Sequence, residues 1–123
     1  MVGTETVMVV EDDEALRKLI VALLEAAGYQ VREAANGGAA LQLVRDRSEH
    51  IHLVLTDVLM PMMSGIDLSS QLRKLQPDLK VLLMSGYAGD LIARYRVAKG
   101  ELMLIEKPFT RQGLLARIRT ALQ

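Results

Sequence analysis

Four apolar stretches of this sequence end in side chains that can bind a phosphoryl group, directly or through a metal ion. Glu11 and Asp12 follow the apolar run TVMVV, and Asp57 stands at the end of a second apolar run. Ser85 and Lys107 stand at the ends of two more. Carboxylates bind hard divalent cations such as Mg²⁺, and a hydroxyl and an ammonium group can neutralise phosphoryl oxygens beside the metal. Together these residue types are complementary to a phosphoryl group.

Each of these residues also has an ordinary explanation. Acidic residues at 11–13 suit the first turn of a helix, because the helix dipole favours negative charge there. Ser85 followed by glycine suits a turn, Lys107 suits a solvated surface, and a lone Asp57 suits a cap or a turn. A single site is the better explanation only if the fold brings the residues together. Clustered carboxylates would then repel one another until Mg²⁺ or Mn²⁺ bound them, and Asp57 could be the nucleophile.

Apolar periodicity predicts five strands that alternate with helices along the chain. The expected strands are 6–10, 29–34, 53–55 with its end at 56–57, 81–84 and 102–105. The expected helices are 16–27, 40–47, 68–75, a weaker one over 89–100, and 114–122. Gly28 is expected to end the first helix, since glycine is common just after helices.

This alternation predicts an α/β fold, a doubly wound (βα)5 domain with helices on both faces of a five-stranded parallel sheet. In the strand order 2-1-3-4-5 the first and third strands are neighbours, which would place Asp12 beside Asp57. The 123 residues fit one domain over 1–123 with its core over about 5–122.

Composition excludes several other classes of protein. Fifteen basic residues balance fifteen acidic ones, so no net charge favours nucleic acid or an anionic membrane. The absence of cysteine excludes disulfides and thiolate metal sites. No apolar run reaches the roughly 18 residues that span a bilayer, and the amino terminus does not resemble a signal peptide. A cytoplasmic domain is therefore expected.

The motifs together resemble the receiver domain of response regulators in two-component signalling, with its CheY-like, flavodoxin-like fold. The matching stretches are VVEDD at 9–13, TDVLMPMMSG at 56–65, MSGY at 84–87 and EKPF at 106–109. The resemblance implies a phosphorylation-controlled switch that accepts a phosphoryl group from the phosphohistidine of a kinase. It also implies self-catalysed phosphorylation and dephosphorylation with Mg²⁺, but no separate substrate and so no enzyme in the usual sense.

The same resemblance assigns a role to each acidic residue. Asp57 would be the phosphoacceptor and a metal ligand. Asp12 would bind the metal directly and Glu11 through water, an assignment that follows from the position of Arg17 after the acidic pair. The backbone carbonyl of Leu59 would complete the protein ligands.

On the neighbouring strands the resemblance makes Ser85 the switch hydroxyl and Lys107 the phosphate-binding lysine. The Lys107–Pro108 peptide is expected to be cis, which an X–Pro bond tolerates better than any other. Leu104 departs from the family, because it occupies the place of the usual aromatic switch residue. We therefore expect the rearrangement that follows phosphorylation to concentrate in the 85–90 loop and the helix after it.

The expected partners are a histidine kinase or phosphotransfer protein and a downstream protein, which would bind the face of the fourth helix, fifth strand and fifth helix. The chain ends one helix after the EKPF motif, so no output domain is expected in it. The stretches GTETVMVVED and MSGYAGD resemble C-terminal receivers of hybrid histidine kinases.

Two alternatives remain open from the sequence. A phosphohydrolase with an aspartyl-phosphate intermediate would also place its nucleophile after a parallel strand, but its general acid usually lies two residues later, where this chain has Leu59. A degenerate receiver that only docks partners is the other alternative. The complete set of Asp12, Asp57, Ser85 and Lys107 argues against it.

Overall fold

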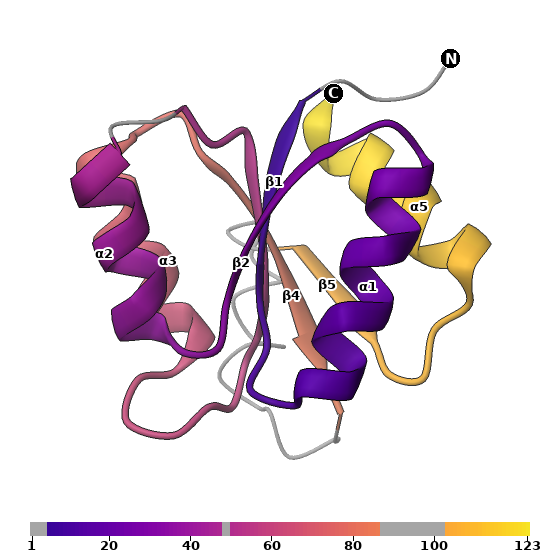
Figure 1. Ribbon diagram of the computed structural model, residues 1–123, viewed down its shortest axis with the longest axis horizontal. Helices are drawn as coiled ribbons and strands as arrows, with labels where there is room; N and C mark the ends of the chain where they lie inside the picture. Colours follow the sequence, from indigo (N-terminus) through magenta and orange to yellow (C-terminus); the bar gives the residue numbers. More distant parts are fainter. Residues whose placement is uncertain (1–4, 48–49, 87–102) are drawn as a thin grey trace.

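Five parallel strands form the centre of the computed structural model, which describes residues 5–47, 50–86 and 103–123 (Figure 1). The order across the sheet is β2-β1-β3-β4-β5, as the alternation of elements predicted. The strands are β1 (Thr6–Val10), β2 (Gln30–Ala34), β3 (Leu53–Asp57), β4 (Lys80–Ser85) and β5 (Met103–Glu106).

The inner strands β1 and β3 are buried at every residue, because helices cover both faces of the sheet. This burial explains why both sequences read as continuous apolar runs rather than as alternating ones. In their register Val10 lies opposite Thr56. The residues that follow, Glu11 and Asp57, therefore leave the sheet at the same level.

Two pairs of helices cover the sheet in the part of the chain that the structure describes (Figure 1). The helices α2 (Gly37–Arg47) and α3 (Gly65–Leu75) pack on one face, and α1 (Glu14–Ala26) and α5 (Arg111–Leu122) pack on the other. The helix expected over 89–100 lies outside the described residues. The doubly wound α/β fold predicted from the sequence is confirmed.

Local signals fix where the helices begin and end. The side chains of Asp13, Ser64 and Thr110 cap α1, α3 and α5 by accepting backbone N–H groups. Gly28 follows the end of α1 with a φ of 100°, a conformation that glycine adopts without the steric cost of a Cβ. The cap at Asp13 makes α1 start directly after the acidic pair.

The apolar stripe of α1 is wider than the core requires. Ile20 and Leu24 are fully buried, but Leu19, another apolar residue of this helix, is 57% exposed. No described helix combines the length and apolar character needed to cross a bilayer.

Candidate functional site

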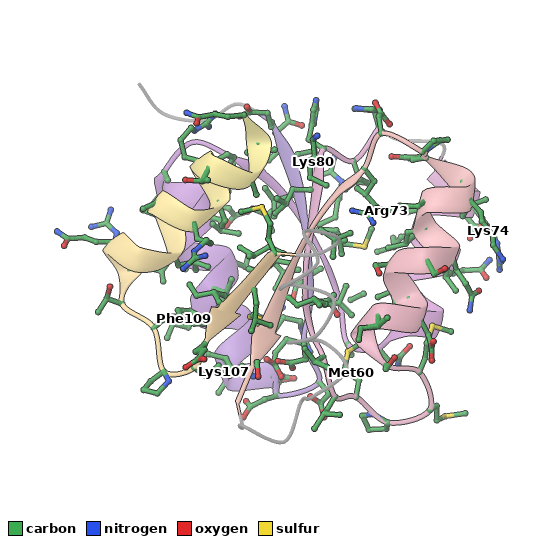
Figure 2. All side chains as sticks on the ribbon, turned by 180° about the vertical axis from the view of Figure 1, so that it is seen from behind. Met60, Arg73, Lys74, Lys80, Lys107 and Phe109 are labelled. Atoms are coloured by element: carbon green, nitrogen blue, oxygen red, sulfur yellow. The ribbon has the colours of Figure 1, made fainter. Side chains whose placement is uncertain are left out.

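The carboxyl ends of the strands bring the predicted site residues to one edge of the sheet. Asp57 and Ser85 are the last residues of β3 and β4. Glu11 and Lys107 directly follow β1 and β5. Figure 2 shows Lys107 and Met60 at this edge, and Lys80 at the opposite one.

Three carboxylates form an acidic cluster in the described part of the chain. Glu11, Asp12 and Asp57 each offer a ligand oxygen, and these oxygens lie within 4.8 Å of one another. Glu11 and Asp57 are buried, whereas Asp12 is exposed. The structure thus places Asp12 beside Asp57, as the strand order predicted. A pocket of about 420 Å³ opens over the cluster, and its lining includes Leu59, Met84 and Gly86.

The ammonium group of Lys107 lies between the two buried carboxylates. Its Nζ is 2.6 Å from Oδ1 of Asp57 and 3.1 Å from Oε1 of Glu11. The backbone N–H of Lys107 donates to the carbonyl of Ser85 at 2.8 Å, which extends the β4–β5 pairing by one residue. The Lys107–Pro108 peptide is cis, as expected. These contacts hold the positively charged ammonium group of Lys107, which follows the edge strand β5, against the two buried carboxylates.

Burial and mutual repulsion separate the pKa values of the two buried carboxyls. Burial raises the pKa of Asp57 to about 7, the hydrogen bond with Glu11 adds to this, and Lys107 opposes it. For Glu11 burial again acts upward, but hydrogen bonds from Asp57, the Asp13 N–H and Lys107 lower its pKa overall. Burial also disfavours the charged form of Lys107, yet its two carboxylate partners raise its pKa. Of the two buried carboxyls, Asp57 is therefore the one that binds a proton more readily.

Ser85 and Leu59 lie where the sequence placed them. Ser85 is 1% exposed and stands between Met84 and Gly86, which line the acidic pocket. Leu59 also lines that pocket and is exposed to solvent. Leu104 is half-buried on β5 and packs against the core on the α2–α3 side of the sheet. Residues 87–90, the remainder of the loop expected to rearrange, lie outside the described residues.

Two residues that support the acidic loop were not recognised as such in the sequence. Arg17 Nη1 donates to the backbone carbonyl of Glu11 at 2.9 Å, and Arg17 Nε donates to Oε1 of Glu33 at 2.9 Å. The sequence offered only a spacing between Arg17 and the acidic pair. The partner Glu33 lies on β2, which is far away in the sequence.

Gly65 supports the site from the other side. Its N–H donates to the carbonyl of Val58 at 2.8 Å, which closes the loop between β3 and α3. A Cβ at this position would overlap the carbonyl oxygen of Asp57 and lie 3.2 Å from Cδ2 of Leu83. Only glycine lets α3 start this close to the end of β3.

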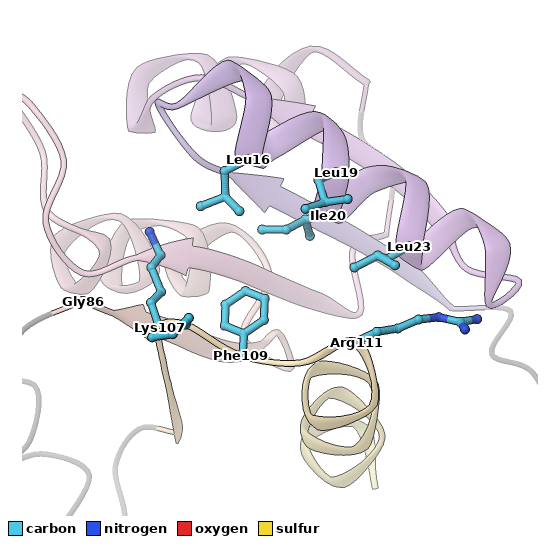
Figure 3. Close-up of a pocket in the computed structure, with 9 residues that line it drawn as sticks. Leu16, Leu19, Ile20, Leu23, Gly86, Lys107, Phe109 and Arg111 are labelled. Atoms are coloured by element: carbon cyan, nitrogen blue, oxygen red, sulfur yellow. The ribbon is translucent and has the colours of Figure 1, made fainter.

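An apolar groove of about 790 Å³ continues from the acidic pocket (Figure 3). It lies between α1 and the segment that leads from β5 into α5, and it shares Gly86 and Lys107 with the pocket. Its lining residues are Leu16, Leu19, Ile20, Leu23, Gly86, Lys107, Pro108, Phe109 and Arg111. Helical periodicity alone does not distinguish these leucines from residues of the core.

Known proteins match this chain over nearly its full length. It is 38% identical to the sensor kinase CckA of Brucella abortus over 98% of this chain, but over only 13% of that kinase. It is 33% identical to the response regulator receiver protein CpdR of the same organism, covering 94% of this chain and 95% of that protein. The crystal structure of the receiver domain from hybrid histidine kinase CckA superposes with a TM-score of 0.80 at 30% identity, covering 96% of this chain and 99% of the other.

The sequence profile of one family, described as the response regulator receiver domain, matches residues 7–119. That range contains β2 to β5 in full, all of β1 except Thr6, and the whole acidic cluster. Phosphorylation of an aspartate is general in this family. The chain therefore belongs to the receiver domains of two-component signalling.

Proposed function

We propose that Asp57 accepts a phosphoryl group from a phosphohistidine of a kinase or phosphotransfer protein. The supporting observation is the buried Asp57 carboxylate, which contacts Lys107 and shares its strand edge with two further carboxylates. A carboxylate oxygen of Asp57 attacks phosphorus, an acyl phosphate P–O bond forms, and the P–N bond to the imidazole breaks. The reaction needs Asp57 ionised, and Lys107 favours that form.

The neighbouring side chains would stabilise the transferred group. Lys107 Nζ already lies 2.6 Å from an oxygen of Asp57, so a phosphoryl group there would be within its reach. The hydroxyl of Ser85, on the adjacent strand, would donate to another phosphoryl oxygen. Donors that are already in place around developing charge stabilise a transition state without a reorganisation cost.

The acidic cluster fits Mg²⁺ or Mn²⁺. Burial and the neighbouring Glu11 disfavour the ionised form of Asp57, and a bound cation would offset that cost. Glu11, Asp12, Asp57 and the backbone carbonyl of Leu59 would hold the metal. When bound, Mg²⁺ supplies positive charge that neutralises the phosphoryl oxygens.

The proposal is tested by incubating the purified protein with acetyl phosphate and Mg²⁺. Intact-mass measurement should show the addition of one phosphoryl group. Reduction with borohydride, which converts an aspartyl phosphate to homoserine, should place the group at Asp57 by peptide mapping. Label on Ser85 or on a histidine would contradict the mechanism, as would label that forms equally well in EDTA.

The apolar groove is the surface on which we expect the phosphodonor to dock. The donor imidazole must approach Asp57, and the groove reaches the acidic pocket through Lys107 and Gly86. Leu19 offers apolar surface there that the fold itself does not bury. A helix that carries the histidine could cover this surface while its imidazole reaches the pocket.

Leu19→Glu should slow phosphotransfer from a cognate kinase by about tenfold or more, because it places a charge in a buried interface. The rate with acetyl phosphate should not change, since this small donor needs no docking surface. Leu75→Glu is the matched control, because Leu75 is also exposed but lies on α3, against the other face of the sheet. Equal kinase-dependent rates for both variants would place the docking surface elsewhere.

The same geometry fits a signalling module better than a hydrolase. Leu59 is apolar and exposed beside the pocket, so it offers no proton to a leaving group.

We expect the phosphorylated domain to signal to a downstream protein through the face that includes β5 and α5. We place it in the cytoplasm, where the ATP that charges a kinase histidine is available.

A further inference from the structure

The acidic loop at residues 11–13 needs an external support, because it lies between the end of β1 and the start of α1. The N–H of Glu11 donates to the carbonyl of Ala34 on β2 at 3.1 Å. The N–H of Asp13 donates to Oε2 of Glu11 at 3.0 Å. Neither contact fixes the peptide that joins Glu11 to Asp12, whose carboxylate belongs to the acidic cluster.

Arg17 supplies the contact to this peptide. Its Nη1 donates to the carbonyl oxygen of Glu11 at 2.9 Å, and only 12% of its side chain is exposed. Because a trans peptide is planar, fixing this carbonyl also fixes the N–H of Asp12 and the direction in which the chain enters its Cα. The guanidinium thus sets the orientation of the backbone that carries Asp12.

The guanidinium of Arg17 is itself fixed from β2. Its Nε donates to Oε1 of Glu33 at 2.9 Å, so the planar group makes two contacts in different directions. Lys18 Nζ also contacts the Glu33 carboxylate, at 3.0 Å from each oxygen. The hydrogen bonds from Lys18 and the one from Arg17 lower the pKa of Glu33, which favours its ionised form. Arg17 therefore connects the acidic loop to Glu33 on β2 through two hydrogen bonds.

We propose that Arg17 is a positioning residue for the metal and phosphoryl site. Held by Glu33, it fixes the Glu11–Asp12 peptide so that the Asp12 carboxylate reaches the point where Glu11 and Asp57 converge. The inference rests on the proposed function, because it concerns the same metal site. Arg17 does not contact the metal or the phosphoryl group, and it acts through the backbone.

The experiment compares Arg17→Met with Lys18→Met by calorimetric titration with Mg²⁺. Both changes remove one positive charge from beside Glu33, but Lys18 is 59% exposed and its Nζ contacts Glu33 rather than the acidic loop. Removing an outer partner of metal ligands typically weakens metal binding about 10- to 100-fold. Arg17→Met should therefore raise the Kd for Mg²⁺ about tenfold or more, and Lys18→Met should leave it within about twofold.

Two further readouts separate positioning from general stability. The rate of phosphorylation by acetyl phosphate should recover in Arg17→Met at saturating Mg²⁺, because only the metal affinity is lost. Amide exchange at Asp12 and Asp13 should be faster in the metal-free variant. Arg17→Lys keeps the charge but cannot make both contacts, so its Kd should lie between those of wild type and Arg17→Met. Glu33→Gln combined with Arg17→Met should be no worse than Arg17→Met alone.

The positioning role of Arg17 would be overturned if Arg17→Met and Arg17→Lys bound Mg²⁺ with wild-type affinity, whatever their melting temperatures. This outcome would leave the proposed metal site intact. A wild-type protein that binds no Mg²⁺ would overturn both this inference and the proposed metal site. If Arg17→Met does not fold, the comparison of Arg17→Lys with Lys18→Met decides by the same affinities.

Discussion

Asp57→Asn should abolish phosphoryl uptake and, in the absence of metal, make the protein more stable at pH 8. The loss of uptake follows from the loss of the nucleophilic oxygen. The gain in stability follows from the buried position of Asp57, whose ionised form is disfavoured by burial and by Glu11. A pKa of about 7 against an ordinary value of 3.8 corresponds to a free-energy cost on the order of 4 kcal/mol for the ionised carboxyl. The neutral amide avoids that cost.

The pH dependence of this stability difference has a defined sign. Because the folded pKa of Asp57 is raised, the folded state binds more protons than the unfolded state between about pH 4 and pH 7. This group therefore makes the free energy of unfolding fall as pH rises through that range. The advantage of Asp57→Asn should be full above about pH 7 and should vanish near pH 4.

Melting curves of both proteins in EDTA at pH 4.5 and pH 8 test this prediction. At pH 8 the melting temperature of Asp57→Asn should be higher by several degrees, since 1 kcal/mol corresponds to about 3–6 °C for a domain of this size. Mg²⁺ should raise the melting temperature of the wild type and reduce the difference. Asp67→Asn, an exposed control on α3, should keep full phosphoryl uptake. The same stability difference at both pH values would contradict the raised pKa.

The sequence predicted the sheet well because its signals are local. β1 and β3 contain consecutive apolar residues, and a charged residue follows β1 and ends β3, so the type and the end of each strand were readable without a structure. The strand order needed only the alternation with helices and one topological rule. The convergence of Glu11, Asp57 and Lys107 at one edge then followed.

The sequence did not reveal features that depend on distant residues. The support of the acidic loop by Arg17 needs a partner on β2. The exposure of Leu19 depends on how α5 packs beside α1, because helical periodicity cannot distinguish the core side of an apolar stripe from the wall of a groove. The high pKa of Asp57 depends on burial and on Glu11, which follows another strand.

Gly65→Ala should lower both the stability of the fold and the competence of the site. The added Cβ would overlap the backbone carbonyl oxygen of Asp57, and the Leu83 methyl group 3.2 Å away blocks the alternative direction. A flexible side chain could move aside, but this oxygen belongs to the last residue of a buried central strand. Either α3 or the end of β3 must shift, which would stretch the 2.8 Å bond from Gly65 N–H to Val58.

We expect Gly65→Ala to cost about 3 kcal/mol or more, which corresponds to a fall in melting temperature of about 10 °C or more. Gly38→Ala is the matched control. Gly38 lies within α2, and a Cβ there would meet only Oδ1 of Asn36, at 3.4 Å. That change should be neutral or stabilise the protein by up to about 1 kcal/mol. Because a shift at β3 also moves the Asp57 carboxylate away from Lys107, phosphorylation by acetyl phosphate should slow in Gly65→Ala even well below its melting temperature. Equal melting temperatures and equal rates in both variants would show that the loop after β3 can relax without disturbing the site.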